Sequence, residues 1–171
     1  MNHSPALLEL SARVGHALVQ HQLRLACAES CTGGGIAALI TATAGSSAWF
    51  ECGFITYSNE SKQYLLGVLP ATLQQHGAVS EAVVDEMTRG ALSRSHGRAQ
   101  VSLAVSGIAG PGGSTTDKPV GTVCFGWCLA DSFPITTTCH FDGDRHTVQQ
   151  AAIIHALNGL LALLGCQQAM P

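Results

Sequence analysis

The chain has 171 residues, of which 46% are hydrophobic and 11% charged, so we expect one folded domain over residues 1–171 with a sizeable core. The formal net charge of −3 comes from eight basic and eleven acidic residues, and the basic ones are scattered. This pattern excludes a continuous basic surface for DNA or RNA, and no uncharged apolar run is long enough to predict a membrane span.

Seven cysteines are spread along the chain, an odd number without a CxxC pair. The N-terminal residues also lack the long apolar segment of a secretion signal, so we expect a reduced cytoplasmic protein. Neither the cysteines nor the eight dispersed histidines have zinc-site spacing, and we expect no metal and no organic cofactor. Because few residues are charged, part of the surface is expected to be covered by a second copy of the chain, which would make a homodimer.

The first half of the chain alternates between helical and extended patterns. The expected elements are a helix over 5–21, a strand over 23–28, a helix over 32–43 ended by Gly45, and a strand over 49–57. After them, the polar segment 58–62 is expected to form a turn or a short helix. Pro70 is expected to break the apolar run 65–68.

The second half predicts one more helix before the strands become consecutive. The expected elements are a helix from the N-cap Ser80 to about 95, strands over 101–105, 120–130 and 135–141, and a final helix over 144–164 capped by Asp144. The resulting order α, β, α, β, α, β, β, β, α predicts an α/β fold. We expect a single-domain three-layer sandwich, with one mixed sheet between two layers of helices.

The segment AESCTGGG at 28–35 lies between an expected strand and an expected helix. A serine at this junction, Ser30, can direct its hydroxyl into a cleft, and free N–H groups at the start of the helix can stabilise an oxyanion. The simpler interpretation is a Ser/Thr cap before a glycine-rich helix start. Three glycines in a first turn would cost up to about 1 kcal/mol each relative to alanine, which favours the functional interpretation.

The segment 57–62 offers a base for such a serine, because no histidine stands in a serine-hydrolase motif. A desolvated lysine, here Lys62, can act as the base when burial lowers its pKa. The Tyr57 hydroxyl can relay a proton or orient a substrate. The alternative is a solvated surface lysine, and the segment by itself favours that alternative.

Two further segments can bind an anion. Successive N–H groups in the glycine-rich loop 105–113 can form a nest, although the loop is neither a P-loop nor a dinucleotide motif. Arg145 follows Gly143 and Asp144 at the start of the last helix and can hold a phosphate there. The alternatives are a plain structural loop and a surface arginine.

Together these segments resemble the CinA C-terminal domain family, which includes stand-alone nicotinamide-nucleotide amidases. The matching stretches cover most of residues 23–157. They are AESCTGG at 28–34, AGSSAWFECGFITYSNESK at 44–62, LGVLPATLQQHGAVSE at 66–81, SGIAGPGG at 106–113, KPVGTV at 118–123 and GDR at 143–145.

The resemblance implies hydrolysis of the carboxamide of nicotinamide mononucleotide (NMN), without a metal or cofactor. By this analogy Ser30 is the nucleophile, Lys62 the general base and Tyr57 an assisting group. Other residues would bind the substrate: the N–H groups around Thr32, Gly33 and Gly34 meet the oxyanion, Ser106 and Gly107 line the pocket, and Arg145 contacts the phosphate.

The chain departs from the family pattern at three positions, and two other functions stay open. Gly112 stands where an aspartate is common, and Gln149 and Gln150 stand where basic residues are common. One alternative makes Cys31 the nucleophile, since a helix N-terminus can activate a thiol. In the other, the chain is a non-catalytic module that binds pyridine nucleotides.

Overall fold

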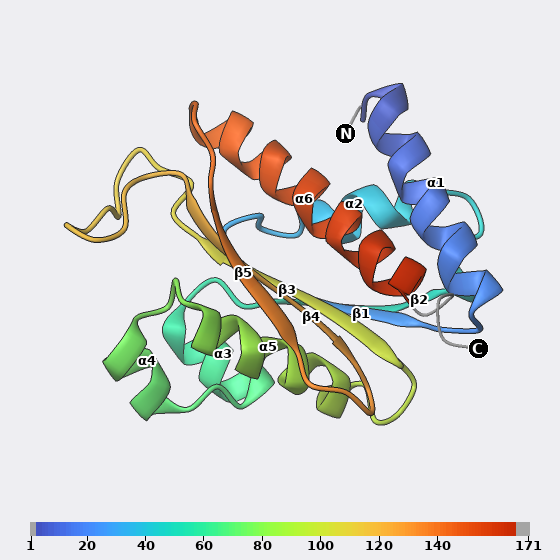
Figure 1. Cartoon of the computed structure of the whole chain (residues 1–171), viewed down its shortest axis with the longest axis horizontal. Helices are drawn as coiled ribbons and strands as arrows, with labels where there is room; N and C mark the ends of the chain where they lie inside the picture. The colour runs from blue at the N-terminus through green and yellow to red at the C-terminus, as the bar shows by residue number, and fades with distance from the viewer. Residues whose placement is uncertain (1–2, 167–171) are drawn as a thin grey trace.

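The computed structural model describes residues 3–166, which form one five-stranded sheet flanked by helices (Figure 1). The strands are β1 (Leu25–Glu29), β2 (Phe50–Ile55), β3 (Val101–Gly107), β4 (Thr122–Leu129) and β5 (Ile135–His140). The α-helices are α1 (Pro5–Gln20), α2 (Gly35–Thr41), α3 (Asn59–Leu66), α4 (Pro70–His76), α5 (Glu81–Arg94) and α6 (Arg145–Cys166), and a short 3-10 helix spans Ser46–Ala48.

The sheet has the order β2-β1-β3-β4-β5 and mixes two directions of pairing. Strand β1 pairs in parallel with β2 and β3, while β4 is antiparallel to both β3 and β5. Strands β1, β2, β3 and β5 therefore all end at the same edge of the sheet. In open α/β sheets, this carboxyl edge is where ligands bind.

Helices cover both faces of the sheet: α1, α2 and α6 lie on one face, and α3, α4 and α5 on the other (Figure 1). Alternate residues of β1 divide between the two sides, because side chains of a strand point to opposite faces. Leu25 and Cys27 belong to one apolar core, and Ala26 and Ala28 to the other. The expected α/β sandwich with a mixed sheet is confirmed.

Two helices differ from the sequence prediction: α2 starts later than expected, and α4 was not expected. Helix α2 begins at Gly35 instead of Thr32, because Gly33 and Gly34 have φ angles of 60° and 95° and form a turn before it. Pro70, expected only to end an apolar run, lies in the first turn of α4. Proline is tolerated there because the N–H groups of a first turn have no intrahelical partner.

The segment 58–62 begins a true helix, α3, which continues to Leu66. The Ser58 hydroxyl caps it by accepting a bond from the Ser61 N–H at 3.0 Å, and Gly67 ends it in a left-handed conformation. Ser80 caps α5 and the Asp144 carboxylate caps α6, both as expected. Strand β4 begins at 122, two residues later than predicted.

Helix α6 is long and apolar enough, by length and composition alone, to cross a membrane. In the fold, however, one side of it packs into the apolar core above the sheet. The residues in this contact include Val148, Ala152, Ala156 and Leu160, all fully buried. This packing accounts for its apolar composition.

Gly90 allows α5 to pack closely against α3, the helix that carries Lys62. A Cβ at Gly90 would overlap the Leu66 backbone oxygen, which cannot move like the end of a side chain. We expect Gly90→Ala to lower the free energy of unfolding by about 1–3 kcal/mol through overpacking. Urea denaturation measures this change.

Gly165→Ala is the matched control, because nothing lies within 4 Å of a Cβ at this other helical glycine. It should be neutral or stabilising by up to about 1 kcal/mol, which is the gain in helix propensity. Equal effects of the two substitutions would contradict the packing argument.

Candidate active site

Ser30 directly follows β1 at the carboxyl edge of the sheet. Its N–H donates to the Val105 carbonyl at 3.0 Å, so its backbone stays attached to β3 although the strand has ended. The residue is buried, and its hydroxyl opens into a cavity at this edge. A serine held by the central strands is a rigid place for a reacting group.

Lys62 comes from α3 and reaches the Ser30 hydroxyl. Its Nζ lies 2.9 Å from Ser30 Oγ and donates to the Thr56 carbonyl at 2.8 Å and the Tyr57 carbonyl at 3.4 Å. Those carbonyls belong to the short link between β2 and α3, which turns the helix back over the end of the sheet. The two residues predicted as nucleophile and base are therefore in direct contact, although 32 positions separate them.

Burial lowers the pKa of Lys62 from 10.5 to about 8, against a small opposing effect of the Cys31 thiol. The side chain is only 1% exposed, which removes the water that would stabilise its charge. Within residues 3–166 it forms no ion pair with a carboxylate. About a tenth of the amine is thus neutral at pH 7, far more than for an ordinary lysine, and this neutral form can accept a proton.

Glu29, which the sequence prediction did not assign a role, lies under the turn that follows Ser30. Its carboxylate is fully buried and accepts bonds from the Thr32 hydroxyl at 2.7 Å and the Gly34 N–H at 3.0 Å. It also accepts the N–H groups of Ile36 at 3.1 Å and Ala37 at 2.9 Å. The signal in the sequence was an acidic residue at a strand end shortly before a helix start, where a negative charge is favourable.

These contacts determine which N–H groups of the turn are free to bind an oxyanion. The N–H of Gly34 is bound to Glu29, and the N–H of Gly33 donates to the Ser30 carbonyl at 3.0 Å. Among the described residues, the N–H groups of Cys31 and Thr32 donate to no other residue. The free donors of the turn are therefore those immediately after Ser30, not those of the glycines.

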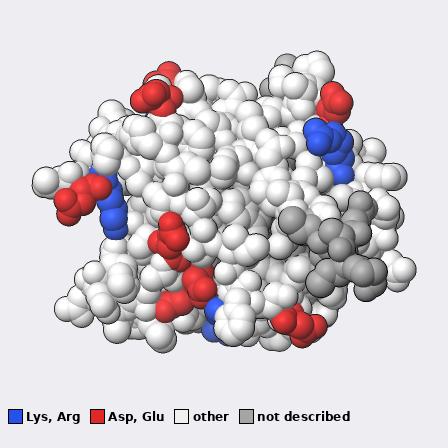
Figure 2. Space-filling model, viewed as in Figure 1, with Lys and Arg blue, Asp and Glu red and all other residues white. Residues whose placement is uncertain are grey.

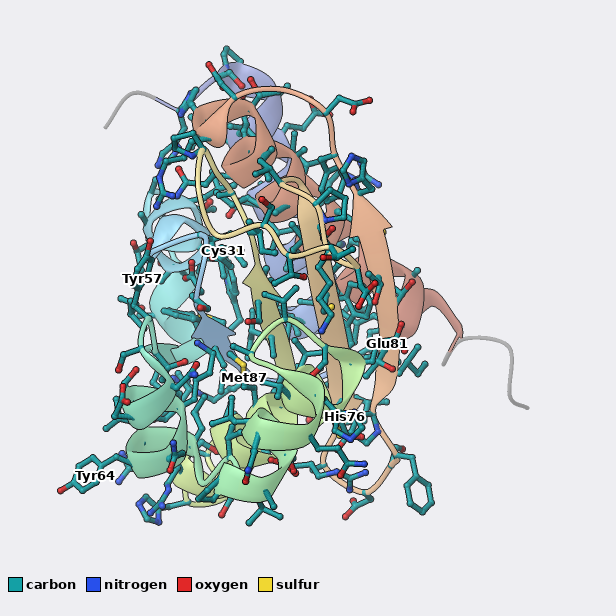
Figure 3. The ribbon with its side chains drawn as sticks, turned by 90° about the vertical axis from the view of Figure 1, so that its left-hand side faces the viewer. Cys31, Tyr57, Tyr64, His76, Glu81 and Met87 are labelled. Atoms are coloured by element: carbon teal, nitrogen blue, oxygen red, sulfur yellow. The ribbon has the colours of Figure 1, made fainter. Side chains whose placement is uncertain are left out.

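Arg145 and Tyr57 meet at the rim of the site, although 88 positions separate them. The Arg145 guanidinium donates to the Tyr57 hydroxyl and to the Gly110 carbonyl, each at 2.9 Å. Tyr57 lies near the surface beside the Cys31 turn, while Tyr64, the other tyrosine, extends into solvent (Figure 3). Tyr57 is thus the tyrosine that belongs to the site.

The cavity at the Ser30 hydroxyl has a volume of about 260 Å³. Ser106, at the end of β3, donates its hydroxyl to the Ala78 carbonyl at 2.7 Å and so joins two walls. The lining consists of residues from the ends of three strands, the start of two helices, the link before α5 and the glycine-rich loop: Ser30, Cys31, Tyr57, Asn59, Lys62, Ala78, Val79, Ser106, Gly107, Ile108, Ala109, Gly110, Gly112, Gly113 and Arg145. Six of the nine predicted site residues are brought together here.

The other three predicted residues, Thr32, Gly33 and Gly34, line a separate cavity of about 430 Å³ behind the turn. Gln149 and Gln150 on α6 line it too. The Gln149 side-chain amide donates to the Cys31 carbonyl at 2.7 Å. Of the family departures, Gly112 therefore faces the Ser30 cavity, and Gln149 supports the turn from behind.

The Cys31 thiol is poorly suited to act as a nucleophile. Burial raises its pKa to about 12, although its own backbone N–H, Lys62 and Arg145 oppose the shift. A neutral thiol is a weak nucleophile compared with a thiolate. The cysteines whose side chains the structure describes, at positions 27, 31, 52, 124, 128 and 139, are all free, and no group of three or more potential metal ligands occurs among the described residues.

The charge distribution agrees with a small-molecule site. On the face drawn in Figure 2, groups of both signs are few and separated by uncharged surface. The described part of this face shows no basic strip that could follow a nucleic-acid backbone. Arg145 and Lys62 are the basic residues of the Ser30 cavity.

The family model of the CinA C-terminal domain matches residues 7–164 of the sequence. This chain belongs to that family. A nicotinamide-nucleotide amidohydrolase, PncC, of Escherichia coli K12 is 51% identical over 90% of this chain and 92% of its own length. The protein of the same name from Pseudomonas putida is 49% identical, over 90% of this chain and 94% of its own length.

The chain is also similar to a longer protein and to a protein of known structure. A putative competence-damage inducible protein of Symbiobacterium thermophilum is 48% identical over 86% of this chain, which matches 36% of that protein. The crystal structure of a competence/damage inducible protein from Agrobacterium tumefaciens superposes with a TM-score of 0.90 at 40% identity, covering 95% of this chain and 99% of that one.

The low pKa of Lys62 predicts a specific pH dependence of stability. Because the unfolded lysine titrates near 10.5 and the folded one near 8, the unfolded state binds more protons between these values. Stability from this group therefore rises with pH across that window. From pH 7.5 to 9.5, we expect the free energy of unfolding of the wild type to rise by about 2 kcal/mol relative to Lys62→Met.

Urea denaturation of both proteins at the two pH values measures this difference. The comparison removes the contribution of the cysteines, which titrate in both proteins. A constant difference between wild type and variant would show that Lys62 has an ordinary pKa.

Proposed function

We propose that this chain hydrolyses the carboxamide of NMN to nicotinate mononucleotide and ammonia, as part of pyridine-nucleotide recycling. The observation that carries this proposal is the 2.9 Å contact between the buried Lys62 amine and the Ser30 hydroxyl, inside a cavity that also holds Arg145. The names of relatives that are about 50% identical over nine-tenths of the chain support the choice of substrate.

The contacts of Lys62 suit it to act as the base. A neutral amine has two hydrogens and one lone pair. When the hydrogens point to the carbonyls of Thr56 and Tyr57, the lone pair faces Ser30 and can accept its hydroxyl hydrogen. The same two carbonyls stabilise the ammonium form that follows proton transfer.

The reaction then proceeds through an acyl-enzyme. Ser30 Oγ bonds to the carboxamide carbon as its proton moves to Lys62, and the N–H groups of Cys31 and Thr32 stabilise the oxyanion. The C–N bond breaks, and Lys62 returns the proton to the leaving nitrogen to give ammonia. Water loses a proton to Lys62 and adds to the ester. Cleavage of the ester bond frees nicotinate mononucleotide, and Lys62 returns the proton to Ser30 Oγ.

Arg145 is proposed to bind the phosphate of the substrate. The Asp144 carboxylate already occupies the N-terminus of α6, bonded to the Thr147 N–H and hydroxyl at 2.8 Å, and these bonds lower its pKa. The Thr147 N–H at that helix end is therefore already bonded and is not free for the phosphate. The Arg145 guanidinium, held at the rim by Tyr57 and Gly110, is therefore the cation that faces the substrate, and Tyr57 orients it.

The nucleophile and base are tested by ammonia release from NMN. We expect wild-type turnover, and a loss of at least about 1,000-fold in kcat for both Ser30→Ala and Lys62→Met, since nucleophile and base act as one unit. Ser102→Ala is the control: this buried serine donates to the Thr88 carbonyl at 2.9 Å near the opposite end of the sheet. It should retain near wild-type kcat.

Folded Ser30→Ala with unchanged activity would contradict the assigned nucleophile. NMN binding in calorimetry without ammonia release by the wild type would instead support the alternative of a non-catalytic binding module.

If Cys31 were the nucleophile, Cys31→Ala would abolish activity, whereas our proposal predicts that the variant stays active. Because burial keeps this thiol protonated, we expect the variant to retain kcat within about a few-fold of wild type. Ammonia release measures it alongside Ser30→Ala. Activity lost in Cys31→Ala and kept in Ser30→Ala would transfer the nucleophilic role to the thiol.

The phosphate role of Arg145 is tested with two substrates. Loss of a charge-assisted contact to the phosphate predicts an increase in KM for NMN of about 10–100-fold in Arg145→Met. Nicotinamide riboside lacks the phosphate, so its weaker turnover should change little in the variant. Arg89→Met, which removes an exposed arginine paired with Asp85, is the control. A similar loss for both substrates would contradict a phosphate-specific role.

The predictions of a cytoplasmic location and a homodimer accompany this function and remain predictions from the sequence. Sedimentation velocity on the purified protein measures the oligomeric state directly.

A further inference from the structure

A buried carboxylate without a cationic partner stands next to the nucleophile. The Glu29 side chain is 0% exposed, and within residues 3–166 it forms no ion pair. Burying an ionised carboxylate is strongly unfavourable unless hydrogen bonds compensate. The hydrogen bonds of Glu29 must therefore compensate for its burial.

The Glu29 carboxylate binds both parts of the segment after Ser30. One oxygen accepts from the Thr32 hydroxyl and the Gly34 and Ile36 N–H groups, and the other accepts from the Ala37 N–H. It therefore joins the turn to the first turn of α2. These bonds hold Gly33 and Gly34 in left-handed conformations, and the N–H groups of Cys31 and Thr32 donate to no other described residue.

The Glu29 backbone connects to the base as well. Its carbonyl accepts the Thr56 N–H at 2.7 Å, and the Thr56 carbonyl accepts from Lys62 Nζ at 2.8 Å. Lys62 in turn contacts Ser30, the residue after Glu29. The chain of contacts Glu29–Thr56–Lys62–Ser30 closes on itself, so the backbone of Glu29 is linked to the nucleophile on one side and to the base on the other.

We propose that Glu29 is a positioning residue whose buried carboxylate holds the turn that presents Ser30 to Lys62. It touches neither substrate nor the reacting atoms. This inference rests on the proposed function, in which Ser30 is the nucleophile. A displacement of about 1 Å at a reacting group can lower a rate by about 100-fold, which sets the size of the expected effect.

Glu29→Gln keeps the size of the side chain but replaces one acceptor oxygen with an NH₂ group. Either orientation of the amide directs a donor at backbone N–H groups that need an acceptor. We expect kcat for NMN to fall about 100-fold per folded molecule, with KM nearly unchanged, because the cavity that binds the substrate keeps its lining.

The control is Glu86→Gln, which removes a carboxylate of the same kind away from the site. Glu86 accepts from the Leu69 N–H at 2.8 Å and the Thr72 hydroxyl at 2.6 Å, and so caps α4. Its substitution should lower the melting temperature but leave kcat per folded molecule near that of wild type. If Glu29 had only a structural role, Glu29→Gln would likewise lower the melting temperature and leave kcat per folded molecule near that of wild type.

Reactivity toward a fluorophosphonate separates this inference from the choice of substrate. The Ser30 oxygen displaces fluoride from phosphorus while Lys62 accepts the proton, and mass spectrometry follows the adduct without NMN. Labelling of Glu29→Gln should be about 100-fold slower than that of wild type. A wild type that labels at Ser30 but releases no ammonia from NMN would refute the substrate and leave the labelling ratio to decide the role of Glu29.

A second variant covers the case in which Glu29→Gln does not fold. Thr32→Val removes only the hydroxyl bonded to Glu29 and keeps the branched shape of a buried side chain. We expect slower labelling and a lower kcat than wild type, with a smaller loss than in Glu29→Gln. Wild-type rates in a folded Glu29→Gln, or in Thr32→Val when the first variant is unfolded, would overturn the proposal.

Discussion

The site depends on a lysine that is buried without a counter-charge. Lys62 is 1% exposed, and in the described part of the chain only the Ser30 hydroxyl and two backbone carbonyls contact its amine. An acidic partner would raise its pKa and keep it protonated, whereas burial lowers its pKa to about 8. Burial of this basic amine beside a hydroxyl therefore lowers the free energy of unfolding at neutral pH.

The direction of the strands explains why the required groups converge. Three neighbouring parallel strands end at one edge, and the chain leaves them through Ser30, Tyr57 and Gly107. The antiparallel pair β4–β5 then returns the chain to the same edge, where α6 begins with Arg145. Ser30 and Tyr57 lie just after strands, and Lys62 and Arg145 lie in the first turn of a helix, so the site needs little ordering when a substrate binds.

Much of this architecture could be predicted from the sequence. Apolar periodicity gave the order of the main elements, and the motifs around Ser30, Lys62 and Arg145 identified the residues that meet in the cavity. Helix α4 was missed because Pro70 was interpreted only as an interruption. The contact between Ser30 and Lys62 depends on how β1 and β2 pair, which local patterns do not determine.

The orientation of the turn after Ser30 could not be predicted, for a physical reason. The N–H groups of Gly33 and Gly34 were expected to face a substrate, but left-handed φ angles direct them to partners within the protein. Glu29 was overlooked because acidic residues are almost always exposed, and only the complete fold buries it. Gln149 supports Cys31 across 118 positions, a contact that has no local signal.

The dependence of kcat/KM for NMN on pH tests the central claim, that the neutral amine of Lys62 activates Ser30. This ratio reports the free enzyme, and the second ionisation of a phosphate lies near about 6, below the range of interest. We expect kcat/KM to rise with pH and to level off with an apparent pKa near 8, the pKa of Lys62. A ratio that stays constant between about pH 7 and 9 would contradict the claim, because no group with this pKa would then control the reaction.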